Sequence, residues 1–216
     1  MFDRGSLTQS SPNPNPDEPM RYLFQSLVLL AGLGFSSIAA ADTWAVDASH
    51  SQVGFSVTHM LISTVKGSFS GFEGSVETDA DGKLQSLQGK VTVGSVDTSN
   101  EKRDGHLKSP EFFDIASHPE MTFRSTKVTS NGQGYQMTGD LTIRGVTRPV
   151  TFTVGELKGP VADPWGNVKA GTVATATINR QDFGVSWSQT LDTGGAVVSD
   201  EVAIELQLEL VKSAGK

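Results

Sequence analysis

Few residues of this chain carry a pattern typical of catalysis or metal binding. Asp192-Thr193-Gly194 is the tripeptide of aspartic proteases, in which two such aspartates share a proton, and the chain contains it once. Only a homodimer would supply the second copy. The stretch 77–82 resembles the start of a calcium loop, but its twelfth position falls on Gln88, where a bidentate Glu is required. These motifs predict no catalytic residue and no metal site, and 77–82 is better explained as a hairpin turn.

The histidines are scattered along the chain, at His50, His59, His106 and His118. None forms a His-x-His motif or an i, i+4 pair, so a metal site would depend on groups that only the fold brings together. The absence of cysteine excludes disulfides and thiolate-bound metals. His59 shares the face of Phe55 and Val57, where a neutral imidazole could hydrogen-bond a ligand head group. A hydrogen-bonded core histidine is the alternative.

The elements that would position these residues are strands with one apolar face. The clearest lies at 201–210, where an apolar residue occupies every even position and most odd positions are Glu or Gln. One dry face and one wet face are typical of an antiparallel sheet. Similar segments lie at 52–59, 65–76, 84–96, 120–128, 134–144, 148–154 and 167–178. Eight strands predict a closed antiparallel β-barrel, whose interior holds packed side chains or one small ligand, and a two-sheet sandwich is the alternative.

One segment interrupts the strands, between the third and the fourth. Residues 97–114 are rich in charge, and Thr98 with Glu101 fits a capping box at the start of a helix. Ser109-Pro110 suits the start of a second short helical turn. We expect this segment to lie across one end of the sheet.

The inward positions of the strands predict the wall of an interior cavity. The wall residues are Phe55, Val57, Phe69, Val91, Val93, Phe123, Leu141, Ile143, Phe152, Ile204, Leu206 and Leu208. Phe112, Phe113 and Trp187 are expected at its mouth. Small inward residues either leave room for a ligand or relieve strand curvature, and both can hold. These are Gly67, Gly74, Gly89, Gly139, Ala170, Ala174 and Ala176.

The N-terminal region predicts export. Residues 1–19 are rich in Pro, Ser and Asn and are expected to be a disordered leader, with either Met1 or Met20 as the start. Residues 20–41 combine an arginine, a short apolar run and small residues, which is typical of a signal peptide cleaved after Ala41. Residues 42–216 are then the folded domain.

The charge of that domain argues against some partners. It carries 15 Lys and Arg and 21 Asp and Glu, a net charge of −6, with no basic stripe. Such a surface gives no electrostatic reason to bind nucleic acid or an anionic membrane. We therefore expect neither a nucleic-acid partner nor stable membrane insertion.

Several motifs occur together in a characteristic order. They are Val46-Asp47, Ser49-His50-Ser51, Phe55-Ser56-Val57-Thr58-His59-Met60, Lys66-Gly67-Ser68-Phe69, Arg103-Asp104-Gly105-His106-Leu107, Phe112-Phe113-Asp114, Gly139-Asp140-Leu141-Thr142-Ile143-Arg144-Gly145, Asp182-Phe183-Gly184 and Ser199-Asp200-Glu201-Val202. As a set, spread over 42–211, they resemble the YceI-like family of polyisoprenoid-binding proteins. The resemblance implies a lipocalin-like barrel in the periplasm that encloses a polyisoprenoid, such as an isoprenoid quinone or polyprenyl lipid, or a fatty-acid derivative.

The resemblance implies neither catalytic residues nor a cofactor beyond this apolar ligand. Arg103, Asp104 and His106 match the family's most recognisable motif, and they either fasten their segment to the barrel or touch the ligand. The sequence thus predicts a periplasmic lipid carrier that is not an enzyme. A solid-cored structural or partner-binding module and a lipid-modifying enzyme are the alternatives, and a homodimer stays open.

Overall fold

The computed structural model describes residues 41–192 and 194–213. The expected leader (1–19) and all of the expected signal peptide except Ala41 lie outside the described residues. The strands are β1 (Asp42–Val46), β2 (Gln52–His59), β3 (Ser63–Phe69), β4 (Phe72–Thr78), β5 (Leu84–Thr92), β6 (Val96–Asp97), β7 (Glu120–Ser130), β8 (Gly134–Ile143), β9 (Val146–Gly155), β10 (Lys158–Ala162), β11 (Val168–Asn179) and β12 (Val198–Lys212). One α-helix, α1 (Glu101–Lys108), and two 3-10 turns, η1 (Val93–Ser95) and η2 (Arg180–Phe183), complete the described elements.

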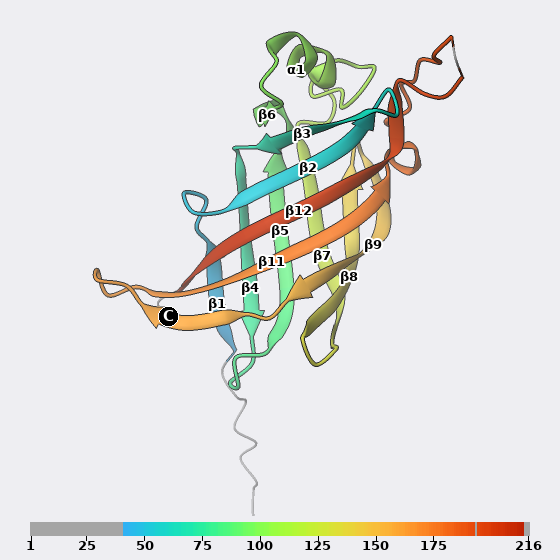
Figure 1. The fold of residues 1–216 in the computed structure, drawn as a ribbon. Helices are drawn as coiled ribbons and strands as arrows, with labels where there is room; N and C mark the ends of the chain where they lie inside the picture. The colour runs from blue at the N-terminus through green and yellow to red at the C-terminus, as the bar shows by residue number, and fades with distance from the viewer. Residues whose placement is uncertain (1–40, 193, 214–216) are drawn as a thin grey trace, which may run out of the picture. The chain divides into compact units, whose positions relative to one another are not determined.

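Eight of the strands close into an antiparallel barrel. They are paired in the order β11-β9-β8-β7-β5-β4-β1-β12, and the pairing of β11 with β12 completes the ring (Figure 1). The β11–β12 ladder is long, running from Lys169 opposite Val211 to Asn179 opposite Glu201. The predicted closed eight-stranded barrel is therefore confirmed, and the sandwich alternative is wrong.

The ring includes β1, which precedes the first predicted strand, whereas the predicted strand 52–59 is β2 and lies outside the ring. Residues 47–51, between β1 and β2, lie alongside β12. Residues 210–212 of β12 pair with β1, and residues 198–207 pair with β2. The predicted strand 84–96 ends at Thr92 and is followed by η1. The predicted strand 65–76 is divided at Ser70-Gly71, where glycine and a parity change favour a bulge. As a result β4 belongs to the ring, whereas β3 pairs with β2 and with the short β6.

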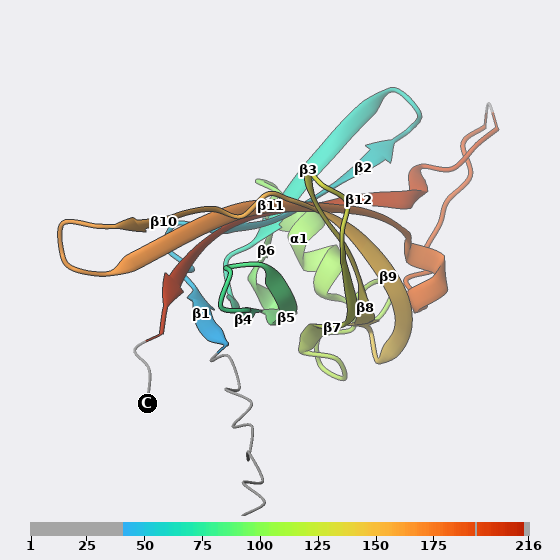
Figure 2. The ribbon, with the colours of Figure 1, turned by 90° about the horizontal axis from the view of Figure 1, so that it is seen from below.

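Two hairpins extend beyond the ring (Figure 2). One is the β2–β3 hairpin, and the other is formed by β10 and β11. The sequence analysis does not predict β10, because its residues Lys158–Ala162 are all exposed and carry no alternating pattern. In the part of the chain that the structure describes, no helix combines the length and the hydrophobicity needed to cross a membrane.

The helix lies between β6 and β7, as the sequence predicts, but its start differs. The N-cap is Asn100, whose side chain accepts a hydrogen bond from the Arg103 backbone N–H at 3.0 Å, so the expected capping box at Thr98 is wrong. Thr98 is instead hydrogen-bonded to a side chain within the helix, that of Asp104. Ser109 caps the C-terminal end of the helix, and its carbonyl accepts a hydrogen bond from Phe112 N, so a short turn follows at the place predicted from Ser109-Pro110.

The barrel end at the β4–β5 turn is filled with side chains. Trp44, Val76, Leu84 and Leu210 are all buried there. The Trp44 indole N–H donates to the Thr78 hydroxyl at 3.1 Å, so the only polar atom of that ring is satisfied inside the core. The solid-core alternative therefore applies to this end of the barrel.

Candidate ligand-binding site

The barrel encloses a cavity between this filled end and the α1 segment. Its volume is about 210 Å³, larger than the roughly 150 Å³ of an apolar protein cavity that accommodates benzene. Its lining is almost entirely apolar. Most of the residues predicted as the wall or mouth do line it: Phe55, Val57, Phe69, Val91, Phe112, Phe113, Phe123, Leu141, Ile143, Phe152, Ile204, Leu206 and Leu208. The bore is therefore apolar and partly vacant.

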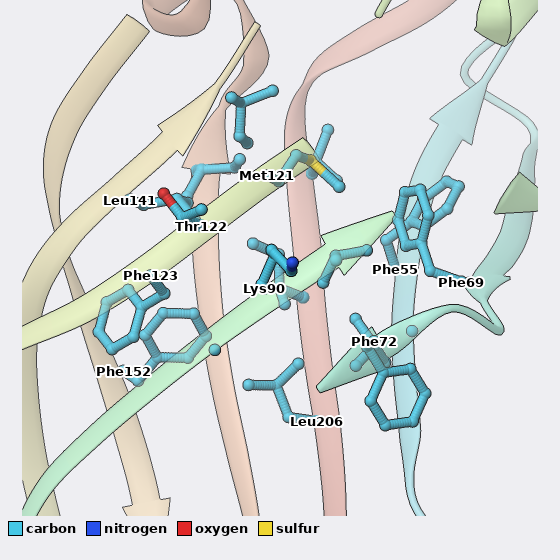
Figure 3. Close-up of a pocket in the computed structure, with 18 of the residues that line it drawn as sticks. Phe55, Phe69, Phe72, Lys90, Met121, Thr122, Phe123, Leu141, Phe152 and Leu206 are labelled. Carbon is cyan, nitrogen blue, oxygen red and sulfur yellow. The ribbon is translucent and has the colours of Figure 1, made fainter. Parts of the chain in front are cut away.

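Phenylalanine rings form two clusters on the cavity wall (Figure 3). The Phe55 and Phe69 ring centroids are 5.5 Å apart, and those of Phe123 and Phe152 are 5.0 Å apart in an edge-to-face arrangement. Rings in such contact are worth about 0.5–1.5 kcal/mol beyond the area that they bury, which holds them in defined positions. They give the cavity a firm aromatic wall on two sides.

The inward glycines have two different roles. A Cβ on Gly67 would lie 2.4 Å from the Phe55 ring, and one on Gly139 would lie 2.5 Å from the Phe123 ring. These two glycines make room for wall phenylalanines. A Cβ on Gly89, in contrast, would meet only the Glu73 carbonyl oxygen, at 3.5 Å, and Gly89 borders the cavity. Both interpretations of the inward glycines therefore hold, at different positions.

The α1 segment covers the second end of the cavity. Leu107, Phe112 and Phe113 line the cavity from that side, and the Phe113 ring lies 6.2 Å from the Phe69 ring. Trp187 is one layer further out. Its ring packs against Phe112 and His106, each at 5.2 Å, so it supports the cover without lining the cavity.

Two other predicted residues also lie outside the lining. His59 ends β2, opposite Val198 and Ser63, beyond the part of the hairpin that borders the cavity. His59 has inward parity but does not line the cavity, because it lies at the turn end of the β2–β3 hairpin. Val93 is 1% exposed but lies in the 3-10 turn that follows β5, within the packed core.

The sequence analysis leaves several lining residues out of its list. They are Val46, Val53, Phe72, Leu87, Leu107, Met121, Met137, Val154, Ile178, Phe183, Val185, Val198 and Val202. Most follow the same alternation as the predicted wall, so parity was a sufficient signal for them. Leu107 and Val185 lie outside strands, and only the tertiary structure brings them to the cavity.

The charged groups beside the cavity are all engaged elsewhere. Among the described residues, no buried side-chain nitrogen or oxygen lacks a hydrogen-bond partner. Arg180, 5% exposed, donates to the carbonyls of Val185 (2.6 Å) and Trp187 (2.7 Å) and to the Asp200 carboxylate (3.0 Å). Burial lowers the pKa of this guanidinium. Its bonds fasten the 185–200 segment to the barrel and leave no donor directed at a ligand.

Lys90 borders the cavity but is directed to the outer surface. Its Nζ pairs with Glu73 at 3.1 Å and Glu120 at 3.2 Å, and its side chain is 41% exposed. These two carboxylates raise the pKa of Lys90. The cavity therefore presents no free charged group to a bound ligand.

The charged side chains of α1 are hydrogen-bonded within their own segment. Asp104 Oδ1 accepts from the Thr98 backbone N–H (3.0 Å) and hydroxyl (2.5 Å), and Arg103 donates to the Thr98 hydroxyl and carbonyl, both at 2.7 Å. His106 contacts Glu111 at 2.5 Å. These contacts favour the structural role, because they fasten the α1 segment to the end of β6.

A second polar cluster joins the β1–β2 break to the barrel. Ligand atoms of Asp47, His50 and Glu209 lie within 4.8 Å of one another, as in a metal site. However, Lys169 Nζ contacts Asp47 at 3.0 Å and Glu209 at 2.6 Å, so an ammonium group already pairs with both carboxylates. Hydrogen bonds from Ser49, His50 and Lys169 hold the pKa of Asp47 well below its ordinary value, and the carboxylates raise the pKa of Lys169 to about 12.

The two other motifs considered for chemistry lie in hairpin loops. Asp192 is exposed beside a turn in which Gly194 N donates to the Leu191 carbonyl at 2.9 Å. Asp79 accepts from the backbone N–H groups of Asp81 and Lys83 at 3.0 and 2.9 Å, which confirms a hairpin turn at 79–82. The geometry of both loops is that of chain reversal.

Comparison with known proteins agrees with this architecture. The YceI-like domain model matches residues 44–210. The chain belongs to the YceI-like family. Relatives include a UPF0312 protein of Staphylococcus aureus, 38% identical over 166 residues (76% of this chain, 94% of the relative), and one of Pectobacterium carotovorum, 37% identical over 185 residues (85% and 92%).

Several solved structures have a similar fold. BcnA of Burkholderia cenocepacia has a TM-score of 0.62 at 28% identity, covering 76% of this chain and 98% of that one. A Campylobacter jejuni YceI protein has a TM-score of 0.61 at 27% identity (73% and 90%). A polyisoprenoid-binding domain from Saccharophagus degradans has a TM-score of 0.54 at 15% identity (79% and 98%), which shows the fold alone.

Proposed function

We propose that this protein is a periplasmic carrier that encloses a long apolar chain, such as a polyisoprenoid or a fatty-acid derivative, inside its barrel. The observation that carries the proposal is the apolar cavity of about 210 Å³, which borders no charged group free to hold a polar ligand. A polar ligand would lose its hydrogen bonds to water without replacement there, whereas an apolar chain would not.

The comparison with solved structures supports a polyisoprenoid as the apolar ligand. The solved neighbour from Saccharophagus degradans is named as a polyisoprenoid-binding domain, and it has the same barrel. Enclosing about ten methylene groups contributes up to ~8 kcal/mol, before the cost of association is subtracted. A short chain would therefore bind weakly, and a polyisoprenoid of several units would bind well.

The size of the cavity adds a condition. Pockets for drug-sized ligands occupy roughly 300–1,000 Å³, more than the cavity of about 210 Å³ in this structure. A long chain is thus enclosed only in part, or it displaces Phe112 and Phe113 at the α1 end. The head group remains outside, since the described residues offer it no polar partner within the cavity.

Export is the second part of the proposal. It rests on the charged, apolar and small-residue pattern of 20–41, with cleavage after Ala41. Fractionation of cells that express the full chain should recover the protein in the periplasm, with an N-terminus at Asp42. A cytoplasmic protein that retains residues 20–41 would contradict it.

The decisive experiment is organic extraction of the natively purified protein, followed by mass spectrometry. We expect about one apolar lipid per barrel. A protein that returns no stoichiometric lipid from any preparation would support a solid-cored or partner-binding module instead. Conversion of the extracted lipid during incubation with fresh protein would support a lipid-modifying enzyme.

A further inference from the structure

The turn of the β2–β3 hairpin exposes three consecutive apolar side chains. Met60, Leu61 and Ile62 are 40%, 66% and 83% exposed, and they are half of the large apolar residues exposed in the described part of the chain. Scattered exposed apolar residues are ordinary, whereas a contiguous group at a protruding tip marks an interaction site. We call these three residues the apolar tip.

The residue types of the apolar tip are unusual for its backbone conformation. Met60 and Leu61 have φ angles of 51° and 64°, and Ile62 N donates to the His59 carbonyl at 3.2 Å. Two left-handed central residues are the geometry of a type I′ turn, for which Asn-Gly is strongly favoured. Large apolar side chains are therefore held here against the local backbone preference.

The apolar tip is also fixed in place. Met60 N donates to the Val197 carbonyl at 2.8 Å, and the Leu61 side chain lies against Gly195. These contacts join it to the loop that precedes β12. The cavity wall is close: Val57 lines the cavity, and Leu61 follows four residues later, no more than about 13 Å along an extended strand.

Charge distinguishes this hairpin from the rest of the surface. From Gln52 to Phe69 the chain contains no Asp or Glu and one cation, Lys66, although the full sequence has 24 acidic against 17 basic residues. An anionic bilayer surface would repel an acidic protein face, but it would not repel the β2–β3 hairpin, which carries no acidic residue. Among the described residues, the hairpin thus combines the longest run of exposed large apolar side chains with the absence of negative charge.

We propose that the apolar tip docks reversibly into the interface of a lipid bilayer, beside the cavity wall. Met60, Leu61 and Ile62 enter the headgroup and acyl boundary, and the acidic remainder of the barrel stays in water. Such shallow, reversible insertion is distinct from membrane spanning. The purpose of docking, exchange of an apolar chain with the membrane, rests on the proposed function, but the docking itself is measured without it.

The test is flotation of the mature protein (42–216) with phosphatidylcholine vesicles, with and without added phosphatidylglycerol. The variant combines Met60→Asn, Leu61→Gly and Ile62→Ser. The first two changes introduce the Asn-Gly pair that a type I′ turn favours. We expect its melting temperature to equal or exceed that of the wild type, and its partitioning into phosphatidylcholine vesicles to fall at least tenfold. Val161→Ser, at a residue 61% exposed on β10, is the matched control and should float like the wild type.

Three results would overturn the inference. They are a wild-type protein that floats with neither vesicle, a triple variant that floats as well as the wild type, and a Val161→Ser variant that loses flotation equally. A dimer that the triple variant converts to monomer, with flotation unchanged, would assign the apolar tip to contact between copies. Lipid extraction reports on the cavity separately, so protein that floats but carries no lipid contradicts the proposed function alone.

Discussion

Filling the cavity from its wall should weaken ligand binding while the barrel stays folded. Gly89 of β5 is the position for this test, because an added Cβ would meet only the Glu73 carbonyl oxygen, at the ordinary contact distance of 3.5 Å. Gly89 pairs with Phe123 of β7, so its side-chain direction is inward. Gly89→Val places three carbon atoms in the space that a ligand chain would occupy.

The expected effect follows from the displaced ligand. Three methylene equivalents at about 0.8 kcal/mol each amount to roughly 2.4 kcal/mol, which weakens binding about fiftyfold. Folding should not suffer, because valine favours an extended strand and glycine weakens one. The variant should therefore unfold at the same temperature as the wild type or a higher one.

The assay is titration with parinaric acid, whose fluorescence rises in an apolar environment, beside thermal unfolding of the same samples. Thr175→Val is the control, since Thr175 is exposed, pairs with Glu205 and lies outside the cavity lining. It should bind the probe as the wild type does. Undiminished binding by a folded Gly89→Val protein would refute an interior site next to β5.

Three further outcomes follow from the core and the polar clusters. Trp44→Phe should lower the free energy of unfolding by about 1–2 kcal/mol in urea, because the buried Thr78 hydroxyl loses its partner, and should leave probe binding unchanged. Arg180→Met should cost about 3 kcal/mol or more, since it unpairs buried carbonyls, and Arg180→Lys should recover only part of this in the same assay. The lowered pKa of Asp47 means that its ionised form stabilises the fold above about pH 4, and that this contribution is lost as the pH falls further. Asp47→Asn should therefore lower the melting temperature at pH 7 and flatten its decline between pH 5 and pH 2; an unchanged profile would contradict a role for the Lys169 cluster.

The amino-acid sequence was sufficient for the barrel and for most of its inner wall. Alternation along β12 and the hairpin turn at 77–82 are local patterns, and they act at the scale on which strands and hairpins form. The same alternation identified Phe55, Phe123 and Leu206 as inward residues. Side-chain parity is a property of the strand alone, so no knowledge of the neighbouring strands was needed.

Parity was insufficient wherever an element leaves the ring. His59 has inward parity but does not line the cavity, because it lies at the turn end of the β2–β3 hairpin. Trp187 and Leu107 lie outside strands, and only the fold decides that Leu107 reaches the cavity and Trp187 supports Phe112. The helix starts at Asn100 and not at Thr98, because the Thr98 hydroxyl is hydrogen-bonded to the Asp104 carboxylate. A capping motif in the sequence does not reveal this competing hydrogen bond.

The sequence by itself determined the residues that face inward, since alternation and turn chemistry are encoded over a few residues. Only the tertiary structure decided which inward positions meet packed atoms and which meet empty space. Gly139 is covered by the Phe123 ring and Gly89 is open, although both are inward glycines on neighbouring parts of the wall. The difference arises because barrel curvature and the α1 segment set the distance between side chains far apart in the sequence, and no local pattern records that distance.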